Sequence, residues 1–181
     1  MNQYLLFGKG ELKEVDDAVC LAEELVSNYF KMSSAQWFKS RYDVRTAKNL
    51  ADHERVKGPF AQVVGYVARK KDASLSSASY NFYRICLQDG AILKAVEEKE
   101  GFRLFPFLLY VVVHELVHIV RFTKFQQIYE ASSIHGTAME EERLVHSLTL
   151  KILSNLTLDG VAIVLNYYRE WRAEPGFDKL V

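Results

Sequence analysis

The stretch from Leu104 to Val120 constrains the fold more than any other part of the sequence. It is apolar except for Pro106 and three ionisable residues, His114, Glu115 and His118. It is shorter than the roughly 20 residues that a membrane-spanning helix needs, and charged residues bracket it closely. A helix that is apolar on all sides must be surrounded by other elements. We therefore expect a helix buried in a protein core, with a membrane-spanning helix as the alternative.

The three ionisable residues have the spacing of a metal site. On a helix, His114 and His118 lie one turn apart and about 40° apart on one face, and Glu115 lies at the edge of the same arc. Two imidazoles can bind one metal ion, and the carboxylate is then placed to hold a metal-activated water. The alternative is a pair of ordinary core histidines. Burying these groups unpaired costs several kcal/mol, and a divalent cation pairs with all three, so the sequence favours the metal site.

The rest of the chain gives a sequence of expected elements. Helical periods cover residues 11–31, 91–98, 105–125, 139–156 and 161–171, and β-forming residues cover 60–68 and 80–87. Gly58-Pro59 breaks the chain before the first expected strand. Residues 32–57 show no clear period, although Trp37 and Phe38 are expected to anchor them. This order predicts an α+β fold with a small mixed or antiparallel sheet and a helical half that carries the histidines.

A catalytic zinc site needs a third protein ligand and an open position for water. One class of site places a third histidine six residues after the second, with a glycine three residues after it. Lys124 and Arg121 occupy those two positions, so this class is excluded. Another class takes a glutamate from a following helix, and the run Glu140-Glu141-Glu142 can supply one.

Acidic residues in a first helical turn usually point to water, so at least two of these three glutamates are expected to be solvated. Glu142 falls on the same broad arc as the apolar residues of its helix, and His146 follows it by one turn. Glu142 is therefore the favoured third ligand. Glu141 and the loop residue His135 are the alternatives.

The pattern HExxH followed by ExxA(N/D)xFA resembles that of glutamate-zincin metallopeptidases, and of ImmA/IrrE-like peptidases especially. Here it reads His114-Glu115-Leu116-Val117-His118 and then Glu142-Arg143-Leu144-Val145-His146, with Ile152-Leu153 further on. Only the HExxH part is specific. The resemblance implies a zincin-like domain in which His114, His118 and Glu142 bind zinc and Glu115 is the general base.

Two positions depart from that family pattern. Val145 stands where the family has a small residue, and His146 stands where it has an Asp or Asn that orients a ligating histidine. His146 could do the same through a ring nitrogen. The resemblance also implies a strand that pairs with extended substrate along the cleft, and the order of elements assigns this role to Tyr80–Leu87.

These residues predict a zinc-dependent metallopeptidase that hydrolyses peptide bonds with a metal-activated water and Glu115 as general base. The alternative is a catalytically inactive or regulatory zincin-like domain that binds metal and recognises a protein partner. A further group must stabilise the oxyanion. Tyr129, Arg143, Tyr167 and Tyr168 are candidates, and the sequence does not choose among them. His53 lies among charged residues and is expected to be solvated.

Composition limits the number of domains, the partners and the compartment that we expect for this protein. The 181 residues suit one domain spanning 1–181, and the 23 basic residues balance the 23 acidic ones. We therefore expect a peptide or protein substrate and neither nucleic acid nor membrane as a partner. The two thiols, Cys20 and Cys86, and an N-terminus without secretory-signal features lead us to expect a cytoplasmic protein.

Overall fold

The computed structural model describes residues 5–33, 35–36, 41–69, 79–129 and 138–170. Within these ranges the chain is a mixed α+β fold, as the sequence predicts. The α-helices are α1 (Lys9–Phe30), α3 (Asp89–Glu98), α4 (Leu104–Tyr129), α5 (Ala138–Leu153) and α6 (Val161–Tyr167). The strands are β1 (Arg41–Arg45), β2 (Ala61–Arg69) and β3 (Ser79–Leu87), and two short 3-10 helices, η1 (Ala47–Asn49) and η2 (Asp52–Glu54), follow β1.

Most of the expected elements are confirmed, with shifts at their ends. The helix that carries the histidines begins at Leu104 and continues to Tyr129, and α6 ends at Tyr167 where the sequence predicts helix to residue 171. Strand β1 lies in the region that shows no clear period in the sequence. Trp37 and Phe38, which we expected to anchor that region, lie outside the described residues.

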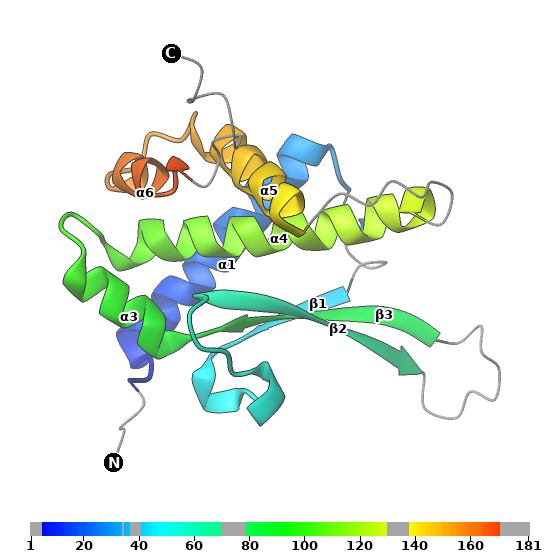
Figure 1. Cartoon of the computed structure of the whole chain (residues 1–181), viewed down its shortest axis with the longest axis horizontal. Helices are drawn as coiled ribbons and strands as arrows, with labels where there is room; N and C mark the ends of the chain where they lie inside the picture. Colours follow the sequence, from blue (N-terminus) through cyan, green and yellow to red (C-terminus); the bar gives the residue numbers. More distant parts are fainter. Residues whose placement is uncertain (1–4, 34, 37–40, 70–78, 130–137, 171–181) are drawn as a thin grey trace.

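Helix α4 is the centre of the core. Figure 1 shows it crossing the molecule between the sheet on one side and α5 on the other. Every residue from Phe107 to Val120 is buried, because α1, α3, α5, α6 and the sheet all pack against this helix. Its apolar segment Leu104–Thr123 is long enough to cross a membrane, but 83% of that window is buried inside the protein. The segment therefore has the burial of a core helix.

The sheet has the order β1-β3-β2, so β3 is its central strand. Strand β3 pairs in parallel with β1 and antiparallel with β2. The expectation that Tyr80–Leu87 is the free edge beside the cleft is therefore wrong. Both hydrogen-bonding edges of β3 are paired, because β1, a strand that the sequence did not predict, pairs with the edge opposite β2. The edge strand that faces the cleft is β2.

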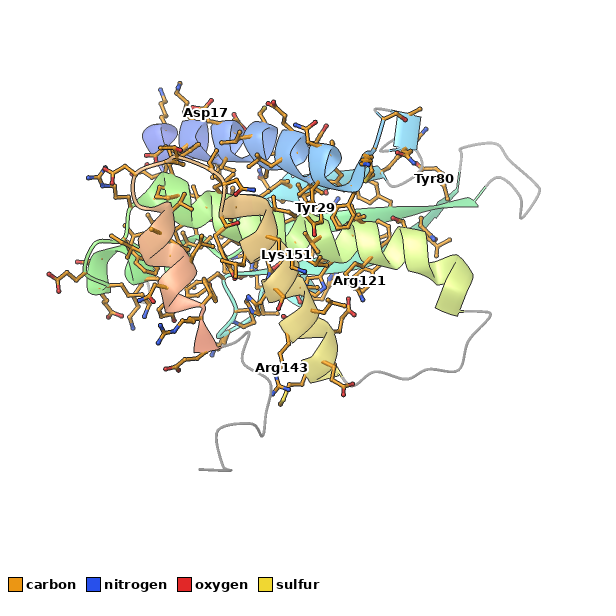
Figure 2. The ribbon with its side chains drawn as sticks, turned by 90° about the horizontal axis from the view of Figure 1, so that it is seen from above. Asp17, Tyr29, Tyr80, Arg121, Arg143 and Lys151 are labelled. Carbon is orange, nitrogen blue, oxygen red and sulfur yellow. The ribbon has the colours of Figure 1, made fainter. Side chains whose placement is uncertain are left out.

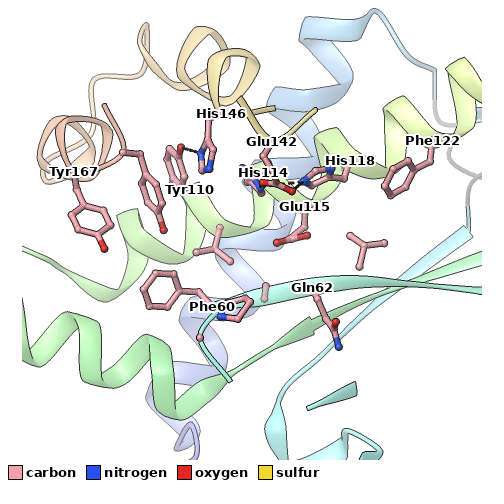
Figure 3. Close-up of a pocket in the computed structure, with 16 residues that line it drawn as sticks. Phe60, Gln62, Tyr110, His114, Glu115, His118, Phe122, Glu142, His146 and Tyr167 are labelled. Atoms are coloured by element: carbon pink, nitrogen blue, oxygen red, sulfur yellow. Dashed lines mark hydrogen bonds and ion pairs between the residues drawn. The ribbon is translucent and has the colours of Figure 1, made fainter. Parts of the chain in front are cut away.

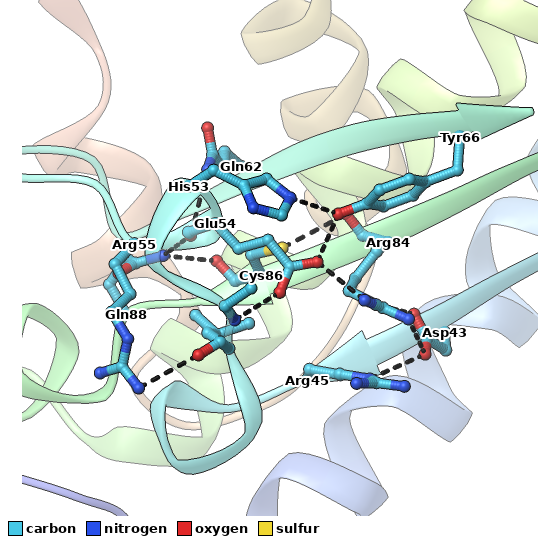
Figure 4. Close-up of polar contacts among 12 residues, drawn as sticks. Asp43, Arg45, His53, Glu54, Arg55, Gln62, Tyr66, Arg84, Cys86 and Gln88 are labelled. Carbon is cyan, nitrogen blue, oxygen red and sulfur yellow. Dashed lines mark hydrogen bonds and ion pairs between the residues drawn. The ribbon is translucent and has the colours of Figure 1, made fainter.

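The two faces of the sheet carry different residues. Side chains alternate along a strand, and Ile85 and Leu87 on β3 are fully buried against the core. On the opposite face, Arg84 reaches Glu54 of η2, which is only 1% exposed, through an ion pair of 2.8 Å. Figure 4 shows this network on the face away from α4. It fastens η2, and with it the segment that leads into β2, to the sheet.

Candidate metal centre

His114 and His118 lie side by side on α4. Helical geometry places them one turn apart, and their Nε2 atoms are 3.2 Å from each other. The two side chains are about one tenth exposed, at the boundary between the core and a cavity. Both nitrogens point toward α5, as Figure 3 shows.

The Glu142 carboxylate on α5 completes this arrangement. One of its oxygens lies 3.3 Å from His114 Nε2 and the other lies 3.2 Å from His118 Nε2. Hydrogen bonds with His114 and then His118 hold the pKa of Glu142 well below its usual range, although burial acts in the opposite direction. The structure thus brings together the three residues that the sequence proposes as ligands.

These three groups fit a divalent metal ion. Ligands about 2.0 Å from a tetrahedrally coordinated ion lie about 3.3 Å from one another, which matches the spacing of the nitrogens and oxygens here. Two imidazoles and one carboxylate suit zinc and several other divalent ions. The Nδ1 atoms of His114 and His118 are buried and have no hydrogen-bond partner among the described residues, so packing and the Nε2 contacts with Glu142 orient these rings.

The neighbouring residue Glu141 fixes the position of α5 on α4. Its carboxylate accepts two hydrogen bonds from the Arg121 guanidinium, at 2.5 and 2.7 Å. Figure 2 places Arg121 near the crossing of α4 and α5. Because this pair uses both oxygens of Glu141, Glu142 is the glutamate left to face the histidines. The alternative ligand His135 lies outside the described residues.

His146 lies one helical turn after Glu142 and is buried. Its Nδ1 is 2.7 Å from the Tyr110 hydroxyl, and its ring is tilted against that of His114. The role that we expected for it, orienting a ligating histidine, is not seen, because neither Nδ1 of His114 nor that of His118 has a hydrogen-bond partner in the described part of the chain. A ring nitrogen of His146 instead lies within 4.8 Å of ligand atoms of His114 and Glu142.

Glu115 is turned away from α5. Its carboxylate is directed into the cavity toward β2, as Figure 3 shows, and the side chain is almost fully buried. Burial raises the pKa of Glu115, and the neighbouring His114 and His118 oppose that rise. The carboxylate and the three proposed ligands therefore border one cavity from two sides.

The cavity has a volume of about 660 Å³ and lies between β2 and α4. The segment from Gly58 to Val63 forms one wall, and aromatic rings cover much of the rest. The aromatic lining residues are Phe60, Tyr110, Phe122, Tyr167 and Tyr168. The sequence predicted a strand after the Gly58-Pro59 break, but it gave no sign that this strand lines the cavity.

The candidates for oxyanion stabilisation are placed differently. Tyr167 and Tyr168 line the cavity, and burial strongly raises the pKa of Tyr168. Arg143 lies at the outer end of α5 and donates to the Met139 sulfur at 3.1 Å. The side chain of Tyr129 lies outside the described residues. Tyr167 at the end of α6 and Tyr168 directly after it are thus the candidates that reach the cavity.

His53 is exposed, as the sequence predicts, and its ring contacts the Tyr66 hydroxyl at 2.9 Å. It lies in the network on the outer face of the sheet (Figure 4) and takes no part in the cavity.

No protein-family model, curated protein or solved structure matches the chain. The chemistry of His114, His118, Glu142 and Glu115 therefore carries the functional argument by itself.

Proposed function

We propose that this protein is a zinc-dependent metallopeptidase of the zincin type. One observation carries the proposal: His114 Nε2, His118 Nε2 and the Glu142 carboxylate converge at 3.2–3.3 Å beside a cavity that Glu115 also enters. Their separations are those of ligands around one ion. The carboxylate of Glu115 is adjacent in the chain to the first of these ligands and is open to the same space.

Each residue has a distinct role in this proposal. Zinc, when bound, supplies a Lewis acid that activates water and polarises the scissile carbonyl. His114, His118 and Glu142 hold the ion. Glu115 accepts the proton from the attacking water and delivers it to the leaving amine. The apolar walls of the cavity exclude bulk water, which strengthens the electrostatic interactions inside it.

The outer edge of β2, which pairs with no other strand among the described residues, is the surface that would hold an extended substrate. The Gln88 amide donates to the Phe60 carbonyl, and Ala61 lies opposite Leu87. Bonded and non-bonded positions alternate in an antiparallel pair, so the peptide groups of Ala61 and Val63 point away from β3. Because both residues line the cavity, their free amides and carbonyls can pair with a substrate backbone.

The substitution Glu115→Gln tests the peptidase. It removes the base and preserves the size of the side chain, so zinc content is expected to stay the same while kcat falls by about 10²- to 10⁴-fold. The measurements are elemental analysis and cleavage of a peptide library read by mass spectrometry. Equal cleavage by both proteins would refute Glu115 as the base.

A second substitution tests the substrate strand. Val63→Pro removes an amide that points to the free edge, and proline is tolerated at such edge positions. We expect unchanged zinc content and a raised KM for peptides. Val63→Ala shortens the side chain and keeps the amide, so its effect on KM is expected to be smaller. An equal effect of the two substitutions would assign the loss to the side chain and not to backbone pairing.

The second candidate is a metal-binding domain that recognises a protein partner without turnover. The position of His146 favours it, since a fourth protein ligand would close the metal site to water. In that case Glu115→Gln would leave the cellular function unchanged, and the wild-type protein would cleave no peptide in the library.

A further inference from the structure

A fourth titratable side chain lies at the proposed metal site. His146 is 6% exposed, and its ring centroid is 4.4 Å from that of His114. A ring nitrogen of His146 is within 4.8 Å of ligand atoms of both His114 and Glu142. Two overlapping sets of ligands therefore share His114 and Glu142. The set with His118 is the tighter one, at 3.2–3.3 Å, and the set with His146 is wider.

The environment of His146 is that of a metal-binding histidine. Such residues nearly always use their second ring nitrogen in a hydrogen bond, which fixes the orientation and tautomer of the ring. His146 Nδ1 has this bond, at 2.7 Å from the Tyr110 hydroxyl, and the ring stacks on Tyr110 and Tyr168. The Nδ1 atoms of His114 and His118 have no partner among the described residues.

The distance that the His146 nitrogen must move to join the other ligands is short. Ligands of one tetrahedral ion lie about 3.3 Å apart, so a separation of up to 4.8 Å exceeds this by at most about 1.5 Å. Rotation of the His146 side chain covers such a distance, because the residue projects from α5 on the same side as Glu142.

We propose that His146 is a fourth, displaceable ligand of the resting metal site. This inference rests on the metal site of the proposed function and adds a form of regulation to it. With His146 bound, the ion has four protein ligands and no open position for water. With the His146 ring turned away from the ion, as in this structure, the open position is restored. In the state with His146 bound, substrate or water must displace the imidazole before reaction.

Cobalt titration of the metal-free protein tests this inference without using activity. Co²⁺ bound by four protein ligands and Co²⁺ with a water in one position differ in visible absorption. We expect His146→Asn to change the wild-type spectrum and to weaken Co²⁺ binding by at least about ten-fold. Tyr110→Phe removes the hydroxyl that orients the ring and is expected to weaken binding by about 10- to 100-fold.

Tyr168→Phe is the matched control. The Tyr168 ring stacks on the rings of Tyr110 and His146, and phenylalanine keeps this stacking, so Co²⁺ affinity and spectrum should equal those of wild type. Circular dichroism of the metal-free variants checks folding. If His146→Asn does not fold, Tyr110→Phe compared with Tyr168→Phe carries the test.

The outcomes separate this inference from the proposed function. Unchanged Co²⁺ affinity and spectrum in His146→Asn would overturn the fourth ligand and leave the three-ligand site intact. A wild-type protein that binds no Co²⁺ would overturn both. The expected cobalt results together with no peptide cleavage by wild type would support the fourth ligand and contradict the peptidase.

Discussion

Two clusters of polar side chains on opposite sides of the sheet each contain a glutamate, and the clusters differ in how the charge of that glutamate is balanced. On the outer face, Glu54 accepts hydrogen bonds from Arg84, Tyr66 and the Ala51 amide (Figure 4). On the α4 side, Glu142 meets only the two imidazoles, and no lysine or arginine among the described residues forms an ion pair with it (Figure 3).

The difference separates a structural cluster from a ligand site. The Glu54 cluster contains its own cation, so its buried charge is neutralised within the chain. The cluster at Glu142 gathers lone pairs at the spacing of metal ligands and lacks a cation of that strength. The two imidazoles are buried and the Glu142 carboxylate is about half exposed, with no lysine or arginine among the described residues beside it. Buried nitrogens gathered around such a carboxylate indicate that something else binds there.

The largest expected effect is on the outer cluster. Arg84→Met leaves the Glu54 carboxylate buried without its cation, and breaking a buried pair costs about 3–5 kcal/mol. Denaturant unfolding of the metal-free protein measures this loss, and metal affinity of the folded fraction should not change. Arg45→Met is the control: it breaks a partly exposed pair with Asp43, which keeps its contacts with Arg84, and should cost no more than about 1 kcal/mol. Similar losses in the two variants would contradict the structural role of Glu54.

Metal should stabilise the protein through the other cluster. Zinc at 100 times its Kd is expected to raise the free energy of unfolding by about 2.7 kcal/mol. For a chain of this length, this corresponds to an increase in Tm of about 5–11 °C. Thermal unfolding with zinc and then with excess chelator measures the gain. His118→Ala should abolish it, whereas Arg84→Met should keep it.

A smaller effect is expected at the contact that positions α5. Arg121→Lys replaces a two-pronged guanidinium with a single charge, so one of the hydrogen bonds to Glu141 is lost. A loss of about 1 kcal/mol in placing Glu142 weakens metal binding about five-fold. Isothermal titration with zinc measures the change. Arg143→Lys, which alters a residue at the outer end of α5, should leave metal affinity unchanged.

The last prediction concerns the titration of Glu54. Burial raises its pKa, but hydrogen bonds from Tyr66, the Ala51 amide and Arg84 outweigh this and lower it from 4.5 to about 2. The lowered pKa in the folded state stabilises the fold above pH 4.5, and this contribution disappears as the pH falls toward 2. Unfolding of wild type and Glu54→Gln across this range measures it. The difference between them should shrink as the pH falls, and a constant difference would contradict the lowered pKa.

Local patterns in the sequence predicted most of the fold. Helices α4 and α5 follow from helical periods, and the strands β2 and β3 follow from runs of β-forming residues. The choice of Glu142 followed from the arc that it shares with Val145 and Ile152, which are buried in the structure. Strand β1 was missed because Arg41–Arg45 is short and mostly polar. Glu54 was missed because it lies among charged residues that are exposed.

The sequence by itself determined the two histidines on one face of a buried helix, because helical spacing is fixed by backbone geometry. It also favoured Glu142 over Glu141 and His135 as the residue that faces them. Tertiary structure decided that β2 and not β3 borders the cavity, that Arg121 engages Glu141, and that Tyr110 holds His146. These contacts join residues far apart in the chain or on different elements, and no periodicity within one segment specifies them. They depend on how the elements pack together around α4.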